Sequence, residues 1–141
     1  MTVPAVVFEN VSRAFGKTIA LGGVGFEVAP GSVLGLIGRN GAGKTTALRL
    51  AVGTLWPDKG RIRVAGVDPV TRRLEVASRV ALLSEESALY PWMTIAEIVK
   101  FTAALHPRWD NALAKRLADD LDLEPAKRIR SEERRVGKSV F

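Results

Sequence analysis

The stretch LIGRNGAGKTTALRL, residues 36–50, contains three glycines, no acidic side chain and a Lys-Thr-Thr triplet. Gly38, Gly43, Lys44 and Thr45 fit the pattern G-x-x-x-x-G-K-[ST] at every specified position. This spacing predicts a loop that wraps a polyphosphate and runs directly into a helix.

The residue types suit that chemistry. Glycines allow successive backbone N–H groups to turn inward and to approach the phosphates closely. A helix that begins at about Gly43 would direct its N-terminal dipole at the same anion. Lys44 would supply a compact cation for the β- and γ-phosphates, and Thr45 a hydroxyl for Mg²⁺.

The flanking residues predict the elements that such a loop connects. Val33–Ile37 is a continuous apolar run, which predicts a fully buried strand. After the loop, Ala47, Leu48, Ala51 and Val52 fall on one helical stripe, and Gly53 would end the helix.

The rest of the chain adds strands and then helices. Thr94 and Glu97 make a capping box that opens a helix through about Leu105. Asp110 can cap another helix, whose leucines recur every four residues at 113, 117 and 121. Further strands are predicted at residues 4–8, within 18–28, at 61–64 and at 79–83, and a short helix at 70–77. The class is α/β of mixed character, with a helical second part.

The bulk composition is that of a globular domain of 141 residues with a net charge of +6. The charge favours anionic partners, but Lys and Arg are scattered, so we expect no nucleic-acid patch. The absence of Cys excludes disulfides and thiolate metal sites. The start of the chain shows no signal-peptide pattern, and its longest apolar run is far short of the ~20 residues of a membrane span.

Several separate segments resemble the ATP-binding (nucleotide-binding) subunit of ABC transporters. They are VSRAFGKTIALGGVGFEVAPGSV (11–33), LGLIGRNGAGKTTALRLAVGTLWPDKGRIRVAG (34–66) and ALYPWMTIAEIVKF (88–101). The segment LHPRWDNALAKRLADDLDLEPAKRIR (105–130) resembles a bacterial subgroup paired with ABC-2-type export permeases. The resemblance implies a P-loop NTPase fold of ABC ATPase type: an N-terminal β-subdomain, the P-loop core and the start of a helical subdomain.

The resemblance also implies a set of ATP-binding residues. Phe15 stands where the family places an aromatic that stacks on adenine, although a core or turn Phe is the alternative. Glu85 stands where the family has a Gln that reaches the metal and the attacking water. A Glu at this position can still ligate Mg²⁺. The alternative, equally well supported by the sequence, is that Glu85 and Glu86 are surface acids. The residues that match the phosphate loop are Gly38, Asn40, Gly41, Ala42, Gly43, Lys44, Thr45 and Thr46, among which Lys44 is a candidate contributor to catalysis.

An apolar group at Leu89, Tyr90, Trp92 and Met93 is implied to meet the membrane subunit, or else fills a gap under the helical subdomain. We therefore expect an integral membrane permease as partner, a second ATP-binding subunit in a dimer, and a peripheral position on the cytoplasmic face of the plasma membrane. His106 precedes Pro107 at a helix end and is interpreted as structural.

The resemblance covers about residues 5–130, and we expect residues 1–130 to be a partial nucleotide-binding domain and residues 131–141 an atypical tail. The family's Leu-Ser-x-Gly signature is expected after Arg130 and Ser131, where this chain has EERRVGKSVF, and the Walker B strand and switch His are not found. We expect that this chain alone does not hydrolyse ATP and that it is unstable or aggregates. A family-specific ending is the alternative for the tail.

The implied function is ATP binding within the ATP-hydrolysing subunit of a transporter that acts through a separate permease. One alternative is a nucleotide-binding module without hydrolysis. The other is a soluble ABC protein acting on nucleic acid or ribosomes.

Overall fold

The computed structural model describes residues 3–83, 89–106 and 108–129, which belong to two compact units, Met1–Leu83 and Ser84–Phe141. The first unit contains a three-stranded sheet built from β1 (Val6–Phe15), β2 (Thr18–Val28) and β3 (Lys59–Val64) in the order β2-β1-β3. Both pairings are antiparallel, and a tight turn joins β1 to β2, so that Phe15 pairs with Thr18. The strands predicted at 4–8, 18–28 and 61–64 are confirmed, and β1 extends well beyond its predicted end.

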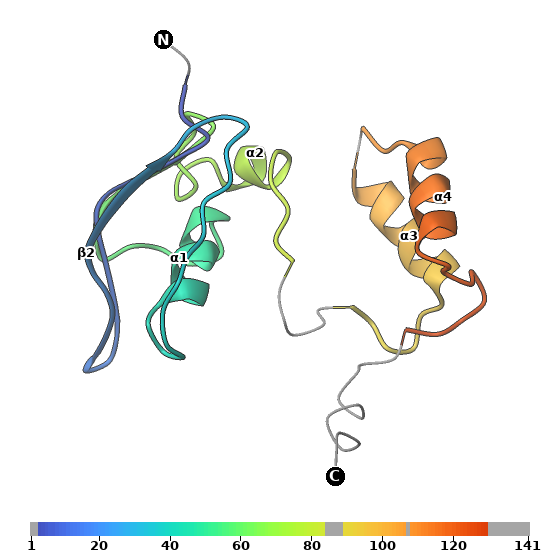
Figure 1. The fold of residues 1–141 in the computed structure, drawn as a ribbon, viewed down its shortest axis with the longest axis horizontal. Helices are drawn as coiled ribbons and strands as arrows, with labels where there is room; N and C mark the ends of the chain where they lie inside the picture. Colours follow the sequence, from blue (N-terminus) through green and yellow to red (C-terminus); the bar gives the residue numbers. More distant parts are fainter. Residues whose placement is uncertain (1–2, 84–88, 107, 130–141) are drawn as a thin grey trace. The chain divides into compact units, whose positions relative to one another are not determined.

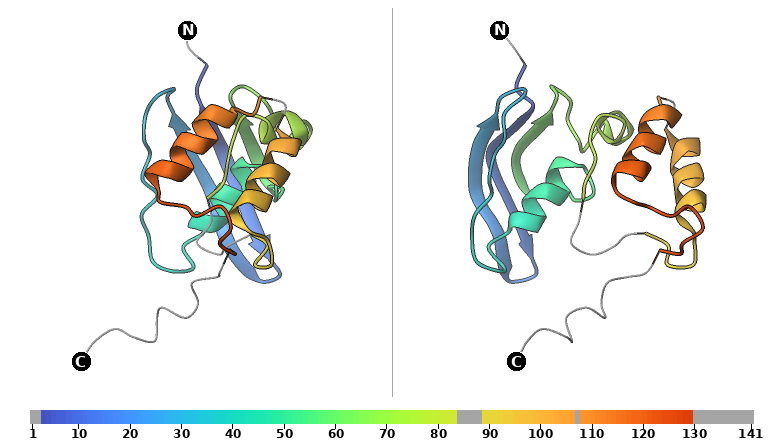
Figure 2. Two further views of the ribbon diagram at one scale, coloured as in Figure 1. Left: turned by 90° about the vertical axis from the view of Figure 1, so that its right-hand side faces the viewer. Right: turned by 45° about the vertical axis from the view of Figure 1, so that its right-hand side comes forward.

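The core of this unit lies between the sheet and α1 (Lys44–Ala51), which covers one face of the sheet (Figures 1 and 2). Ala47 and Leu50 of α1 are buried against sheet residues such as Val11, whose side chain is fully buried. Burying a side chain of this size stabilises the fold by roughly 1.5–3 kcal/mol. The remaining core residues are Phe8, Leu21, Ile62, Val64, Val67 and Val76.

The helical stripe predicted for α1 is only partly correct. Ala47 is buried, but Leu48 is exposed, and Leu50 is the large side chain that faces the core. The apolar face of a helix is wider than a single stripe of residues. The sheet that packs against α1 therefore decides which edge of that face is buried.

Two predicted strands are wrong. Residues 33–37 and 79–83 are not in strands, and Val33, Ile37 and Leu83 are almost fully exposed. An apolar run becomes a strand when its backbone pairs with another, and no such partner for either run occurs within the described residues. The sheet of these residues is accordingly antiparallel and not mixed.

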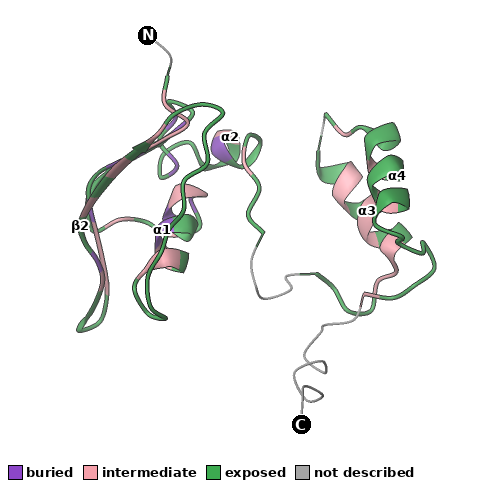
Figure 3. Cartoon of the chain, viewed as in Figure 1, coloured by how far each residue is buried: buried purple, intermediate pink, exposed green. Residues whose placement is uncertain are grey.

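A short helix, α2 (Arg73–Ala77), completes the first unit and places Val76 in the core (Figure 3). It lies within the predicted segment 70–77. Glu75 of this helix pairs with Arg72 and Arg79, on either side of it.

The second unit contains α3 (Ile95–Leu105) and α4 (Asn111–Asp120), as predicted. Thr94 and Glu97 form the expected capping box, and Asp110 Oδ1 accepts hydrogen bonds from the N–H groups of Ala112 and Leu113. Neither helix has a buried residue (Figure 3).

Candidate nucleotide-binding site

The predicted phosphate loop is an exposed turn that leads into α1. Gly41 and Gly43 have φ angles of 85° and 88°, a left-handed conformation that glycine adopts without strain. The Ala42 N–H donates to Arg39 O at 3.1 Å and closes the turn. The loop thus has the glycine-dependent backbone that its sequence predicts.

Gly43 has a second reason to be glycine. A Cβ atom at this position would lie 2.3 Å from Ala20 O and 2.7 Å from Leu21 Cδ2. The end of the loop is therefore in close contact with β2, which fixes where α1 begins.

The N-terminus of α1 leaves backbone donors free for a ligand. Ala47 donates to Gly43 O at 2.9 Å, so the N–H groups of Lys44, Thr45 and Thr46 have no acceptor inside the helix. No side chain caps this end, and its first turn has no acid. These donors and the positive end of the helix dipole favour an anion.

Lys44 places its ammonium group over the same loop. Its Nζ donates to Gly38 O at 2.7 Å and to Arg39 O at 2.9 Å. These partners are neutral carbonyls, so the positive charge of Lys44 is not neutralised by either of them. The group fits the role of a phosphate-binding cation.

Thr45 is exposed and Thr46 is half-buried, so the hydroxyl of Thr45 is accessible to a metal ion. Among the described residues, no three His, Asp or Glu side chains gather into a metal site. Glu85, the other predicted metal contact, lies outside the described residues, as does the tail 131–141. A hydroxyl beside bound phosphate oxygens suits Mg²⁺, which takes oxygen ligands.

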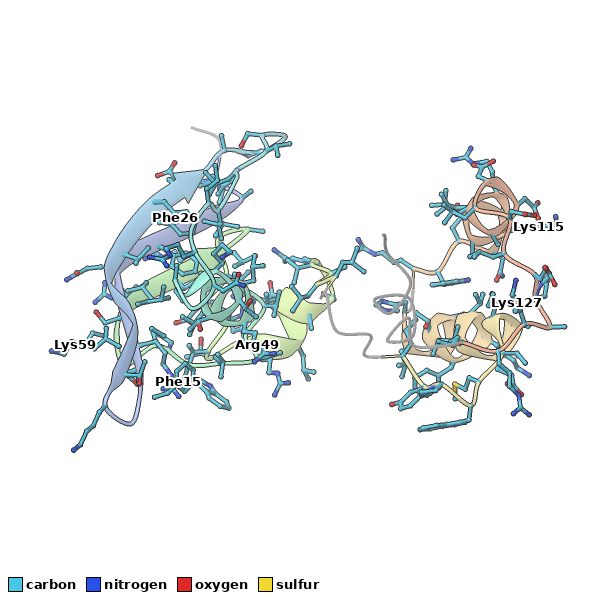
Figure 4. All side chains as sticks on the ribbon, turned by 60° about the horizontal axis from the view of Figure 1, so that its bottom comes forward. Phe15, Phe26, Arg49, Lys59, Lys115 and Lys127 are labelled. Carbon is cyan, nitrogen blue, oxygen red and sulfur yellow. The ribbon has the colours of Figure 1, made fainter. Side chains whose placement is uncertain are left out.

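Phe15 ends β1 and is 46% exposed, so it does not fill the core (Figure 4). The turn that follows it and the phosphate loop lie at the same end of the first unit, as the views agree (Figures 1 and 2). The close contact of Gly43 with Ala20 links the loop to the strand that pairs with Phe15. An aromatic ring and a phosphate loop therefore occupy one end of the same unit.

Two residues beside Phe15 are not marked by any sequence pattern. Arg13 lies with its guanidinium carbon 4.9 Å from the centroid of the Phe15 ring, and Asp58 binds Arg13 at 2.7 Å. Asp58 directly precedes β3, far along the chain from Arg13, so only the tertiary structure brings the pair together.

In the second unit, Leu89, Tyr90 and Trp92 are exposed and Met93 is half-buried. The rings of Tyr90 and Trp92 lie 5.0 Å apart, and Tyr90 meets Phe101 edge-on at 5.8 Å. Tyr90 and Trp92 thus form an exposed aromatic pair, and we call Leu89, Tyr90, Trp92 and Met93 together the 89–93 patch. His106 ends α3 through backbone hydrogen bonds.

The loop, its cation and the free helix N-terminus define a protein of the P-loop nucleotide-binding class. The family model described as ABC transporter matches residues 21–139. The chain belongs to this family, as the sequence resemblance predicts.

The similarity of this chain to individual relatives supports the same family assignment. The chain is 42% identical over 98 residues to the Nod factor export ATP-binding protein I of Paraburkholderia xenovorans, covering 69% of this chain and 32% of the relative. It is 34% identical over 117 residues to a probable sulfate/thiosulfate import ATP-binding protein, CysA, of Chlorella vulgaris, covering 83% and 49%. The chain thus spans between a third and a half of the length of these relatives.

The fold also has a solved counterpart. The ATP-binding subunit of an ABC transporter superposes with a TM-score of 0.77 at 24% identity, over 88% of this chain and 54% of that chain. This likeness confirms the predicted ABC ATPase fold. No helix of the described residues is long and apolar enough to cross a bilayer.

Proposed function

We propose that this chain binds MgATP with the triphosphate in the 38–46 loop and the adenine on the ring of Phe15. The observation that carries the proposal is the convergence of the Lys44 ammonium and three free N–H groups on a loop without acids. Gly38, Asn40, Gly41 and Ala42 would line the phosphates, with Thr45 and Glu85 reaching Mg²⁺.

Bound MgATP supplies a phosphoanhydride bond; the residues of this chain bind and orient it. Lys44 would exchange its two carbonyl partners for β- and γ-phosphate oxygens and so balance negative charge. The N–H groups at the start of α1 would hold the phosphates in a fixed position relative to the sheet.

Equilibrium titration of the chain with MgATP tests this site. Lys44→Ala should abolish measurable binding, because it removes the cation while leaving the helix start intact. Lys59→Ala, at the exposed start of β3, removes the same charge elsewhere and should leave binding unchanged. Binding that survives in the Lys44→Ala variant would defeat the assignment.

We further propose that the whole protein is the ATP-hydrolysing subunit of an ABC transporter. It would act as a dimer with a second ATP-binding subunit, on the cytoplasmic face of the plasma membrane, and drive transport through a separate permease. The family match and the ATP-binding relatives of import and export systems support this role.

The 89–93 patch would receive the permease, because the exposed side chains of Leu89, Tyr90 and Trp92 suit a protein partner. Trp92→Asp should then abolish co-purification with a co-expressed permease subunit, while MgATP binding stays unchanged. Leu123→Asp, which places the same charge at another exposed apolar residue of this unit, is the control. Equal loss of co-purification in both variants would remove the patch from the proposed interface.

A further inference from the structure

Asp58 ties together three consecutive residues at the end of β1. Its Oδ1 accepts from the Arg13 guanidinium and its Oδ2 from the Ala14 N–H, each at 2.7 Å. Its own backbone N–H donates to Ser12 O at 2.8 Å. The segment directly before Phe15 is therefore held from the side by a residue on another part of the chain.

Arg13 transmits this constraint to the aromatic ring. Residues two apart on a strand point to the same face, so Arg13 and Phe15 lie side by side on β1. The guanidinium carbon is 4.9 Å from the ring centroid, within the range of a cation–π contact. Arg13 Nε is buried and has no hydrogen-bond partner among the described residues. The hydrogen bond from Arg13 to Asp58 is therefore the contact that orients the guanidinium group.

The contacts of Asp58 favour its charged form. The hydrogen bond from the Ala14 N–H is the main cause that lowers the pKa of Asp58 below its ordinary value of 3.8; desolvation opposes it, and the nearby Arg13 guanidinium lowers the pKa further.

The ring itself remains available. Arg13 lies against Phe15, yet 46% of the residue is exposed. A side chain at the end of a hairpin can rotate among its staggered conformers, and fixing it on binding costs entropy. A ring already held in one orientation avoids that cost.

We propose that Asp58 and Arg13 are positioning residues, which hold Phe15 in the orientation that stacks on the adenine base. This inference rests on the proposed function, because it concerns the base half of that site. The ligand chemistry is a purine nucleotide: the pair acts on the base and leaves the phosphates to the 38–46 loop.

The test compares two ligands in the full 141-residue chain: MgATP, and magnesium tripolyphosphate, which has phosphates but no base. Asp58→Ala should weaken ATP binding about fivefold, the size of an exposed cation–π or ring-ordering effect, and leave tripolyphosphate binding unchanged. Arg13→Ala should do the same, and Arg13→Lys should restore most of the ATP affinity. Glu75→Ala removes the ion pairs to Arg72 and Arg79 in the same unit, the second of the same length, and should change the affinity for neither ligand.

A double-mutant cycle separates positioning from general damage. In a Phe15→Ala background, Asp58→Ala should weaken ATP binding no further, because no ring remains to be oriented. Unchanged tripolyphosphate binding reports that each variant retains its folded loop.

Three results would overturn the inference. If Phe15→Ala weakens ATP binding and Asp58→Ala does not, the positioning role is wrong and the proposed function stands. If Asp58→Ala weakens both ligands equally, the pair supports the fold and not the ring. If Phe15→Ala leaves ATP affinity unchanged, the base half of the proposed function is itself wrong, and the positioning role falls with it.

Discussion

Gly43 is the residue on which the shape of the phosphate loop depends most directly. Its backbone is left-handed, which costs another residue roughly 1–2 kcal/mol, and an added Cβ would overlap Ala20 O. We predict that Gly43→Ala lowers the free energy of unfolding by about 2–4 kcal/mol, with overpacking adding to the backbone strain. Urea denaturation measures this difference.

Gly31→Ala is the matched control for that prediction. Gly31 also has a positive φ, of 73°, but a Cβ there would meet no atom within 4 Å. It should cost only the backbone strain, about 1–2 kcal/mol. Equal losses in the two variants would show that close contact with β2 contributes nothing.

At the scale of elements, the start of α3 is held by several hydrogen bonds. Glu97 N donates to Thr94 Oγ1 at 3.2 Å, and Thr94 N donates to Glu97 Oε2 at 2.8 Å. The Ile95 and Ala96 N–H groups donate to the carbonyls of Lys127 and Pro125. Since α3 has no buried residue, this cap should matter more than it would on a well-packed helix.

We predict that Thr94→Ala destabilises α3 by ~1 kcal/mol, which corresponds to about fivefold faster amide hydrogen exchange over residues 95–105. Thr102→Ala changes the same residue type within the same helix, where the hydroxyl donates to Ile98 O and caps nothing. Faster exchange in both variants to the same degree would argue against a specific capping effect.

The same cap predicts a pH dependence. The Thr94 N–H, followed by the Thr94 hydroxyl, lowers the pKa of Glu97 below its ordinary value of 4.5. A pKa that is lower in the folded state adds stability above the unfolded value, and this stability is lost as pH falls through the folded value. Protection of the α3 amides, measured as their exchange rate relative to the intrinsic rate at each pH, should therefore fall below about pH 4.5, less so in Glu97→Gln; identical pH profiles of protection would contradict this.

At the scale of the whole molecule, exposed apolar side chains predict self-association. Val33, Ile37 and Leu83 are 99%, 98% and 97% exposed, although each lies in an apolar run. Apolar surface of this kind favours association in water. Val33→Lys combined with Leu83→Lys should raise the monomer fraction of the chain, as measured by size-exclusion chromatography with light scattering.

Ser32→Lys combined with Ser78→Lys provides the control for that double variant. Both serines are exposed, so the substitutions add the same charge without removing apolar surface. If this pair raises the monomer fraction equally, net charge and not the apolar surface controls association.

Features set by a few neighbouring residues were predictable. The left-handed glycines of the loop and the side-chain caps at Thr94 and Asp110 depend on atoms at most four residues away. The phosphate-loop pattern belongs to this group, because its glycine and lysine roles are local. The role of Phe15 remains a prediction.

Features that need a distant partner were not predictable from local pattern. Residues 33–37 and 79–83 have the composition of strands, but a ladder requires a second backbone, and none within the described residues pairs with them. Which edge of α1 is buried was likewise decided by the sheet that it meets.

The sequence by itself determined the glycine-dependent backbone of the 38–46 loop, the helix caps and, through resemblance, the ABC transporter family. The tertiary structure decided what surrounds that loop: Gly43 against Ala20, and Asp58 beside Arg13 and Phe15. The physical reason is the distance along the chain over which each kind of interaction acts. Backbone conformation and capping are short-range effects encoded in adjacent residues, whereas a contact between residues 13 and 58 exists only after the sheet has formed.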